Sequence, residues 1–522
     1  MTQAVSFLAA VLENGRYRKL AALFLGLGAV AALPPFYVIV MLWPALAGFA
    51  LLVWTAATWR RAVVEGWLFG LGWFGGGFYW IGHAFLVDAE RYAALMPMAV
   101  IGIAAGMALY TALHAAVFHF LAKKYTRFGP LLVAAFAGCW ALSEWLRGWV
   151  LTGFPWNPVA SVWGGLPEMM QSAAWVGSLG LGFLTVMIFT APVLLYNCER
   201  QAFRRCALQV LGFGVLLPLL WAGGTWRVDN ASLLTHEGIV LRLIQPAIPQ
   251  ALKWQSGLRQ QHVLKQMAMS KRTVGPSGAP THVIWAETNV PYVIGPDSDI
   301  PPALAAAVPA GGALIFGAPR RDKDGNVYNS LFVIDGNGKI VDVFDKYHLV
   351  PFGEYVPLRN YLPFEKLTAG RGDFTPGPGP KTQHFEGLPP FAAIICYEVI
   401  FSGHVVDPKD RPAWILNITN DAWFGPSTGP RQHLVQAKLR AIEEGLPVVR
   451  VANTGISAVI DPFGRVRNRI ELDEQGVIDA PLPRPLAETF FAIYGQSTGL
   501  IIAWLGILSG LFGRYRRKPG KT

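Results

Sequence analysis

Charged residues are scarce in this sequence. Only 15% of its 522 residues are Asp, Glu, Lys or Arg, while 53% are hydrophobic, and the mean hydropathy is +0.36. An ordinary water-soluble protein and a disordered chain both carry more charge than this, so the composition excludes both classes. We infer that much of the chain lies in lipid.

Several common chemical signatures are also absent. Four cysteines are too few for a disulfide scaffold, and none has the Cys and His spacing of a metal site. We find no G-x-S-x-G elbow, so a serine hydrolase is disfavoured. The net charge of +11 comes from short basic runs between apolar segments, which is unlike the continuous basic stripe of a nucleic-acid-binding protein.

Long apolar runs fill the first part of the chain. Residues 1–226 contain about seven segments long enough to cross a bilayer, and residues 491–522 contain one more, followed by a basic tail. No small-residue cleavage site follows a charged start, so we expect no removed signal peptide. The sequence therefore predicts about eight spans in all.

The cations in the connections predict the orientation of these spans. Basic residues gather in alternate connections, which places them on one side of the membrane, and the positive-inside rule makes that side cytoplasmic. Residues 227–490 then lie on the opposite side. The basic residues are Arg16, Arg18, Lys19, Arg60, Arg61, Lys123, Lys124, Arg127, Arg200, Arg204 and Arg205, with Arg514, Arg516, Arg517 and Lys518 in the tail.

The segment 227–490 is more polar and reads as a separate globular domain. Its short runs of β-branched and apolar residues predict strands, and 251–270 and 430–445 predict helices between them. Strands interleaved with helices favour an α/β layered fold. The predicted strands cover 238–246, 281–287, 313–319, 330–336, 339–346, 391–398, 413–421, 447–453 and 457–462.

Three of these strands end in residues suited to nucleophilic catalysis: Glu287, Lys346 and Cys396. A lone Cys on a strand is more often a buried structural residue, and a single acidic strand end is often a surface charge. Strand ends in an α/β layer, however, are where sites are assembled. A thiol needs a base, which Glu287 can supply, and a cation such as Lys346 to stabilise thiolate and oxyanion.

Residues beside these strand ends predict supporting roles. Glu354, which follows Lys346, is placed to orient that lysine and share its charge. The backbone N–H of Tyr397 is a second oxyanion donor, and Glu398 lies close enough to the thiol to raise the basicity of the site.

At these residues the sequence resembles a known family. The stretches "WAETNVP", "DKYHLVPFGEYVP" and "ICYEVIF" resemble the Glu, Lys and Cys motifs of the nitrilase superfamily. Together with the apolar spans, "IPQALKW" and "NDAWFG", they resemble the apolipoprotein N-acyltransferases of Gram-negative bacteria. The resemblance implies an α-β-β-α nitrilase-like sandwich in the periplasm on an eight-span bundle in the inner membrane.

The resemblance also implies roles and partners. The catalytic residues are then Glu287, Lys346 and Cys396, and the aromatic residues Trp254, Trp423 and Phe424 lie on mobile arms that bind substrate near the lipid. An acyl chain passes from a phospholipid, expected to be phosphatidylethanolamine, through a thioester on the cysteine. The acceptor is the α-amine of the N-terminal diacylglyceryl cysteine of an apolipoprotein, and no cofactor or metal is implied.

Two other classes stay open from the sequence. A membrane-tethered nitrilase-like amidase uses the same three residues but passes the acyl group to water. A transporter or receptor needs paired charges or broken helices within its spans, and apart from Glu144 and Arg147 the spans hold little of that kind.

Overall fold

The computed structural model describes residues 12–196, 198–230, 232–272, 278–357, 359 and 372–512. The chain divides into two compact units. The first, here called the helical unit, comprises Met1–Tyr79, Leu95–Asn230 and Ile493–Thr522, and the second, the sheet unit, comprises Trp80–Ala94 and Ala231–Ala492. Trp80–Ala94 lies within residues 1–226, which the sequence predicts to hold about seven spans. The basic tail from Arg514 to Lys518 lies outside the described residues.

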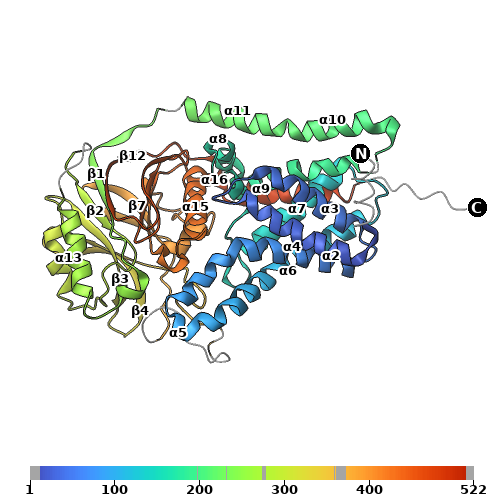
Figure 1. Cartoon of the computed structure of the whole chain (residues 1–522). Helices are drawn as coiled ribbons and strands as arrows, with labels where there is room; N and C mark the ends of the chain where they lie inside the picture. The colour runs from blue at the N-terminus through green and yellow to red at the C-terminus, as the bar shows by residue number, and fades with distance from the viewer. Residues whose placement is uncertain are drawn as a thin grey trace, which may run out of the picture. The chain divides into compact units, whose positions relative to one another are not determined.

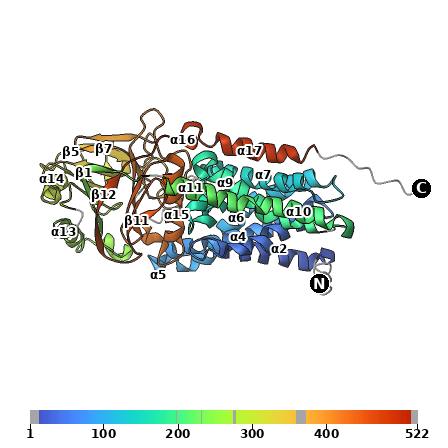
Figure 2. The ribbon, with the colours of Figure 1, turned by 90° about the horizontal axis from the view of Figure 1, so that it is seen from above.

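Long helices build the helical unit, and small residues let them approach closely. A Cβ added to Gly26 would lie 1.9 Å from the carbonyl oxygen of Phe69, and one on Gly138 would lie 2.4 Å from that of Ala503. Glycine is therefore needed where α2 meets α4 and where α7 meets α17, the second pair lying side by side in Figure 2. The helices are α2 (Gly15–Ala29), α3 (Leu42–Thr55), α4 (Trp59–Phe78), α6 (Met96–Ala122), α7 (Pro130–Arg147), α8 (Pro167–Met170), α9 (Ala173–Thr190), α10 (Phe203–Gly214), α11 (Leu216–Asp229) and α17 (Ser497–Ser509).

Three helical stretches in the described residues are long and apolar enough to cross a membrane: Ala89–Ala122, Ala173–Leu195 and Arg200–Asp229. Two apolar helical stretches, Ile39–Thr55 and Ser497–Ser509, are shorter. The last long stretch contains α10 and α11, whose apolar side chains face outward: Leu208 is 67% exposed and Trp226 is 68% exposed. An apolar helix with so little protein around it suits a lipid environment.

Two features of the helical unit were not predicted. Arg18, counted above among the cytoplasmic cations, is buried, and its Nε donates to Glu65 Oε1 at 2.6 Å. Because the two charges compensate each other inside the bundle, Arg18 is a packing residue as well as a basic one. Cys198 and Cys206 form a disulfide.

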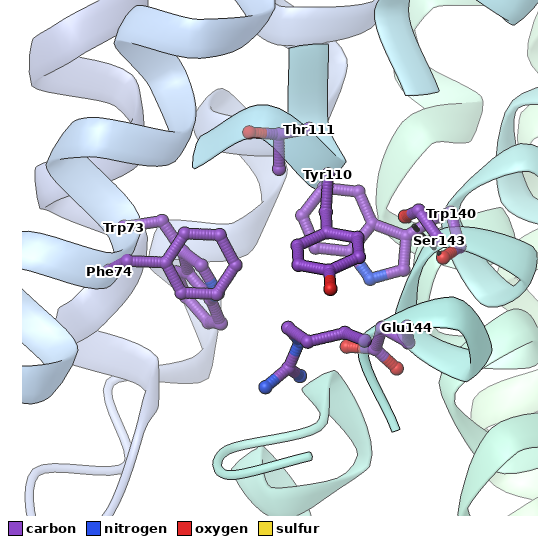
Figure 3. Close-up of a pocket in the computed structure, with 8 residues that line it drawn as sticks. Trp73, Phe74, Tyr110, Thr111, Trp140, Ser143 and Glu144 are labelled. Carbon is purple, nitrogen blue, oxygen red and sulfur yellow. Dashed lines mark hydrogen bonds between the residues drawn. The ribbon is translucent and has the colours of Figure 1, made fainter. Parts of the chain in front are cut away.

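Glu144 and Arg147, the charged pair noted within the spans, line one small pocket with four aromatic rings (Figure 3). Glu144 Oε1 accepts from the backbone N–H of Val159 at 2.8 Å. Arg147 Nη1 donates to the carbonyl oxygens of Phe154 and Trp156, each at 2.6 Å. These bonds fasten the connection after α7 to the helix, which gives both charges a structural role and weakens the case for a transporter path.

In the part of the chain that the structure describes, the sheet unit contains two six-stranded sheets, with strand orders β12-β1-β2-β3-β4-β5 and β11-β10-β9-β8-β7-β6. Strands β1, β2 and β3 run parallel in the first sheet, as β7, β8 and β9 do in the second. The strands are β1 (Thr235–Gln245), β2 (His282–Trp285), β3 (Ala313–Arg321), β4 (Val327–Ile334), β5 (Ile340–Asp345), β6 (Thr382–Phe385), β7 (Leu388–Ile395), β8 (Trp414–Thr419), β9 (Val448–Ala452), β10 (Ser457–Ile460), β11 (Val466–Ile470) and β12 (Gly476–Pro483).

Helices cover the outer faces of the two sheets, and the apolar faces between them form the main core (Figure 1). Leu243 and Ile315 of the first sheet meet Ile395 and Leu416 of the second in that core. A second core joins the first sheet to α13 and α14, and α15 packs on β9 and β10. The helices assigned to the sheet unit are α5 (Ala89–Tyr92), α12 (Gln250–Lys253), α13 (Arg259–Ser270), α14 (Ile300–Leu304) and α15 (Gly429–Glu444), and the residues of α16 (Phe490–Tyr494) divide between the two units.

The layers are therefore helix, sheet, sheet and helix, which is the α-β-β-α sandwich that the resemblance implies. The nine predicted strands and the two predicted helical stretches each overlap an observed element, although 251–270 overlaps two helices, α12 and α13. Strands β6, β11 and β12 were missed.

Candidate active site

Strand ends of both sheets supply the central residues of the site. Glu287 lies two residues after β2, Lys346 directly follows β5, and Cys396 directly follows β7. Lys346 Nζ lies 3.6 Å from Glu287 Oε1 and 2.9 Å from Glu354 Oε2. The structure thus brings the predicted base, its lysine and Glu354 into one buried cluster.

An asparagine in the middle of β4 links the two carboxylates. The Nδ2 of Asn329 donates to Glu287 Oε1 at 2.7 Å and to Glu354 Oε1 at 2.8 Å. The other oxygen of Glu354 accepts from the backbone N–H of Val350 at 2.8 Å. Because these bonds restrict the rotation of both carboxylates, the side chain of Glu287 is held in one orientation. Sequence reasoning missed Asn329, although a polar residue inside a buried strand was a signal.

Lys346 stays a cation in this cluster. Its side chain is 1% exposed, and burial by itself opposes the charge, but Glu354 and Glu287 raise the pKa of Lys346 well above its ordinary value. A permanently charged amine beside the thiol can stabilise both a thiolate and the oxyanion of a tetrahedral intermediate.

Cys396 has a strained backbone and a protonated side chain. Its φ is +53°, a left-handed value that residues other than glycine rarely adopt. Burial raises the pKa of the thiol, and Glu287 and Asp421 raise it further, whereas Lys346 and a hydrogen bond with Thr419 oppose the rise. The resting residue is a thiol, so it needs a base before it can attack.

Glu398 connects the cysteine end of β7 to the lysine end of β5. One oxygen accepts from the N–H of Ile395 at 2.7 Å, and the other accepts from the N–H groups of Tyr347 at 2.7 Å and His348 at 3.1 Å. Burial raises the pKa of Glu398 to about 8, although these N–H donors oppose the rise. The geometry assigns Glu398 to holding two strand ends together, in addition to the predicted effect on basicity.

A buried charged network lies behind Cys396. His433 Nε2 lies 3.2 Å from the carbonyl oxygen of Cys396. Because a carbonyl oxygen can only accept, Nε2 carries the hydrogen in this bond. His433 Nδ1 is 2.9 Å from Asp421 Oδ1, and Arg450 Nη2 donates to Asp421 Oδ2 at 2.6 Å. Burial opposes the charge of Asp421, but Arg450 and His433 hold its pKa below its usual range. Asp421 is the last residue of the predicted strand 413–421, but the sequence did not predict roles for His433 and Arg450.

The aromatic residues assigned to substrate binding occupy two segments. Trp254 follows α12 and is half-buried. Trp423 and Phe424 belong to the short helix η11 (Asp421–Phe424), and both are half-buried. The Phe424 ring lies 4.5 Å from that of Trp80 and 5.7 Å from that of His433, centroid to centroid. Phe424 therefore contacts the network that supports Cys396.

Tyr397 lies in η10 (Cys396–Ile400), the short helix that begins at the cysteine. Its ring packs 5.2 Å from that of Phe401 and 5.7 Å from that of His348. Its backbone N–H is next to Cys396 in the chain.

Within the described residues, no group of three or more His, Cys, Asp or Glu is arranged to hold a metal ion.

The sequence has full-length relatives. It is 38% identical to an apolipoprotein N-acyltransferase of Rhodopseudomonas palustris, covering 98% of this chain and 97% of that protein. It is 39% identical to one of Bradyrhizobium diazoefficiens, covering 98% of both. The chain belongs to the apolipoprotein N-acyltransferase family. Residues 25–191 match the apolipoprotein N-acyltransferase N-terminal domain, and residues 295–490 match the carbon-nitrogen hydrolase family, which fits the nitrilase-like fold.

Solved structures resemble part of this family member. Nit3 of Saccharomyces cerevisiae, a nitrilase superfamily protein, is 17% identical, with a TM-score of 0.35, and covers 48% of this chain and 93% of that one. An amidase from Nesterenkonia sp. is 18% identical, with a TM-score of 0.34, and covers 52% of this chain and 100% of that one.

Proposed function

We propose that this protein transfers an acyl chain from a phospholipid to the α-amine of the N-terminal diacylglyceryl cysteine of apolipoproteins. One observation carries the proposal. A buried thiol, Cys396, shares a site with Glu287 and Lys346 in a chain that is related over 98% of its length to an acyltransferase. The donor is proposed to be phosphatidylethanolamine.

In the first step, the thiol attacks the acyl ester. Glu287 takes the proton of Cys396, and the sulfur bonds to the ester carbonyl carbon. Lys346 and the N–H of Tyr397 stabilise the oxyanion; losing one such donor typically costs about 3 to 4 kcal/mol. The carbon–oxygen bond to glycerol breaks, and the proton held by Glu287 passes to the glycerol oxygen. The products are a thioester and a lysophospholipid.

In the second step, the acceptor amine attacks the thioester in its neutral form. Glu287 takes a proton from the amine as the new carbon–nitrogen bond forms. The carbon–sulfur bond breaks, and the proton returns to the sulfur of Cys396. The enzyme recovers its thiol, and the apolipoprotein leaves with a third acyl chain.

Both substrates are lipid-anchored, so the reaction is proposed to take place at a membrane surface. The proposed arrangement is about eight spans in the bacterial inner membrane, with residues 227–490 in the periplasm. Trp254, Trp423 and Phe424 are proposed to contact the acyl chains on mobile arms. In this arrangement Glu287, Lys346 and Cys396 react with lipids of the outer leaflet of the inner membrane.

The disulfide between Cys198 and Cys206 speaks against this orientation, because the loop that carries it lies on the proposed cytoplasmic side, where disulfides are rare. If the proposed orientation is right, both residues should be thiols in growing cells. A membrane-permeant maleimide added before lysis should label both, as seen by mass spectrometry of their peptides. Complete protection of both cysteines would place this loop outside the cytoplasm.

The transfer is tested with purified protein in mixed micelles. With phosphatidylethanolamine alone, mass spectrometry should find an acyl adduct on the peptide that contains Cys396, and this adduct should persist in buffer. A diacylated lipopeptide with a free N-terminal amine should discharge it, whereas the N-acetylated peptide should not. Rapid hydrolysis in buffer, or equal discharge by both peptides, would favour the alternative, a membrane-tethered amidase.

A further inference from the structure

A second lysine lies buried beside the site, and the steps above do not use it. Lys253 is the last residue of α12 and is 1% exposed. Its Nζ donates to the backbone carbonyl oxygen of Glu287 at 3.0 Å. The residue that follows Lys253 is Trp254, so one short segment carries both the amine and a proposed substrate-binding aromatic.

The main chain that Lys253 holds is strained. Thr288, next to Glu287, has φ +48°, and a Cβ added to Gly317 of β3 would lie 2.5 Å from the Thr288 nitrogen. The turn that aims Glu287 is therefore pressed against β3 on one side and bonded to Lys253 on the other. A strained turn keeps its shape only where surrounding contacts determine it.

The two buried lysines differ in charge. Burial lowers the pKa of Lys253 to about 7, although Glu287 and Cys396 oppose the shift. Carboxylates instead raise the pKa of Lys346, so Lys346 is permanently charged while Lys253 changes charge near neutral pH. The charge of Lys253 acts on both Glu287 and Cys396.

Other groups nearby belong to neighbouring elements. From α13, Arg259 donates to the backbone oxygen of Trp254, and His262 contacts that of Leu252. Lys346 and Glu354 face Glu287, and Asp421 acts on Cys396. All of these groups remain when Lys253 is replaced. Their titration therefore affects the parent protein and a Lys253 variant alike, and it cancels when the reaction rate of one is divided by that of the other.

We propose that Lys253 is a positioning residue for the Glu287–Cys396 pair, holding the Glu287 main chain by a hydrogen bond and favouring the thiolate by its charge. The proposal rests on the function proposed above, but its effect on the reactivity of the Cys396 thiol can be measured without substrate. The hydrogen bond persists when the amine is neutral, because a neutral amine still donates. The charge is present below about pH 7 and is lost above it.

The test is alkylation of Cys396 by iodoacetamide, with no lipid added. The full-length protein and Lys253→Met are compared from pH 6 to pH 9, and the adduct on the Cys396 peptide is followed by mass spectrometry. We expect Lys253→Met to react about tenfold more slowly at pH 6, and only about two- to threefold more slowly at pH 9. A purely structural lysine would give one ratio at every pH.

The matched control is Lys265→Met. Lys265 also donates to a backbone oxygen, that of Pro246 at 2.6 Å, whereas Lys253 bonds the main chain of the catalytic Glu287. Its variant should match the parent at every pH. Equal alkylation of the parent and Lys253→Met, or a pH-independent ratio, would overturn the proposal. If the ratio changes as expected but no acyl adduct forms with phospholipid, Lys253 keeps its role and the proposed acyl transfer fails instead.

Discussion

Asn329→Asp should strongly slow thioester formation. Asn329 donates one bond to Glu287 and one to Glu354. Aspartate of the same shape removes both donors and places a third carboxylate between two others, with Lys346 as their shared cation. A hydrogen bond to a charged group contributes about 1.5 to 3 kcal/mol. The two bonds together contribute about 3 to 6 kcal/mol. If half of that, about 1.5 to 3 kcal/mol, is lost from the transition state, the rate falls about 10- to 150-fold.

Single-turnover mass spectrometry of the acyl adduct measures this rate with phosphatidylethanolamine as donor. Asn329→Ala removes the donors without adding charge, so the difference between Asn329→Asp and Asn329→Ala isolates the effect of the third carboxylate. Ser330→Ala is the matched control in the same strand. Its hydroxyl donates to Asp345 Oδ1 at 2.5 Å, and Arg320 also bonds Asp345, so its loss should change the rate less than about threefold.

Asn329→Asp could also unfold the sheet unit, and thermal unfolding separates that effect from slower chemistry. We expect a lower midpoint for Asn329→Asp but a folded protein at assay temperature. A folded Asn329→Asp that forms the adduct within about threefold of the parent rate would refute the reasoning, because the direction of Glu287 would then not depend on Asn329.

Three further predictions concern the site and the topology. Cys396→Ala should form no thioester, and Glu287→Gln should form it about 100-fold or more slowly, so a normal rate for Glu287→Gln would remove its role as base. A reporter active only outside the cytoplasm should work when fused near Asp297 and fail near Lys124, and the reverse would invert the orientation. Arg450→Met should lower stability at pH 7 by about 3 to 5 kcal/mol, because it removes the guanidinium partner of the buried carboxylate Asp421 and leaves His433 and Thr419 as its contacts. The loss should shrink only as pH falls below about 4, because the low pKa of folded Asp421 stabilises the folded state only while the unfolded carboxyl is ionised; an equal loss at pH 7 and at about pH 2 would contradict this pairing.

Eight of the nine predicted strands contain a buried apolar run, and the exception is the edge strand β5, in which only Phe344 is buried. Strand β8 is buried along its whole length, and so are β9 and β10. The missed strands β6, β11 and β12 lie at the edges of their sheets. Three consecutive residues of β11 are exposed, and the last two of β6 are not buried. An edge strand needs few apolar residues, so its pattern resembles a loop until its partner is known.

The candidate site divides in a similar way. Glu287, Lys346 and Cys396 each stand where an apolar run ends, and such a position is visible within a short stretch of sequence. Asn329 and Arg450 instead lie inside strands, where one polar residue is ambiguous. Their roles come from partners 42 and 29 positions away, Glu287 and Asp421. Contacts over such separations depend on how the strands assemble, which no local pattern contains.

Backbone strain shows why the fold, and not local preference, sets the geometry of the site. Thr288, Phe352 and Cys396 form or adjoin the site, and each has a left-handed φ although it is not glycine. Each such conformation costs about 1 to 3 kcal/mol and needs tertiary contacts to hold it. Those contacts are present: Phe352 N–H donates to the oxygen of Tyr355 at 2.7 Å, and the carbonyl of Cys396 meets His433. None of these three residue types favours the left-handed region, so the packing of the two sheets must set the positions of Glu287, Lys346 and Cys396. A short sequence motif can therefore identify the reactive residues, but it does not identify the residues that orient them.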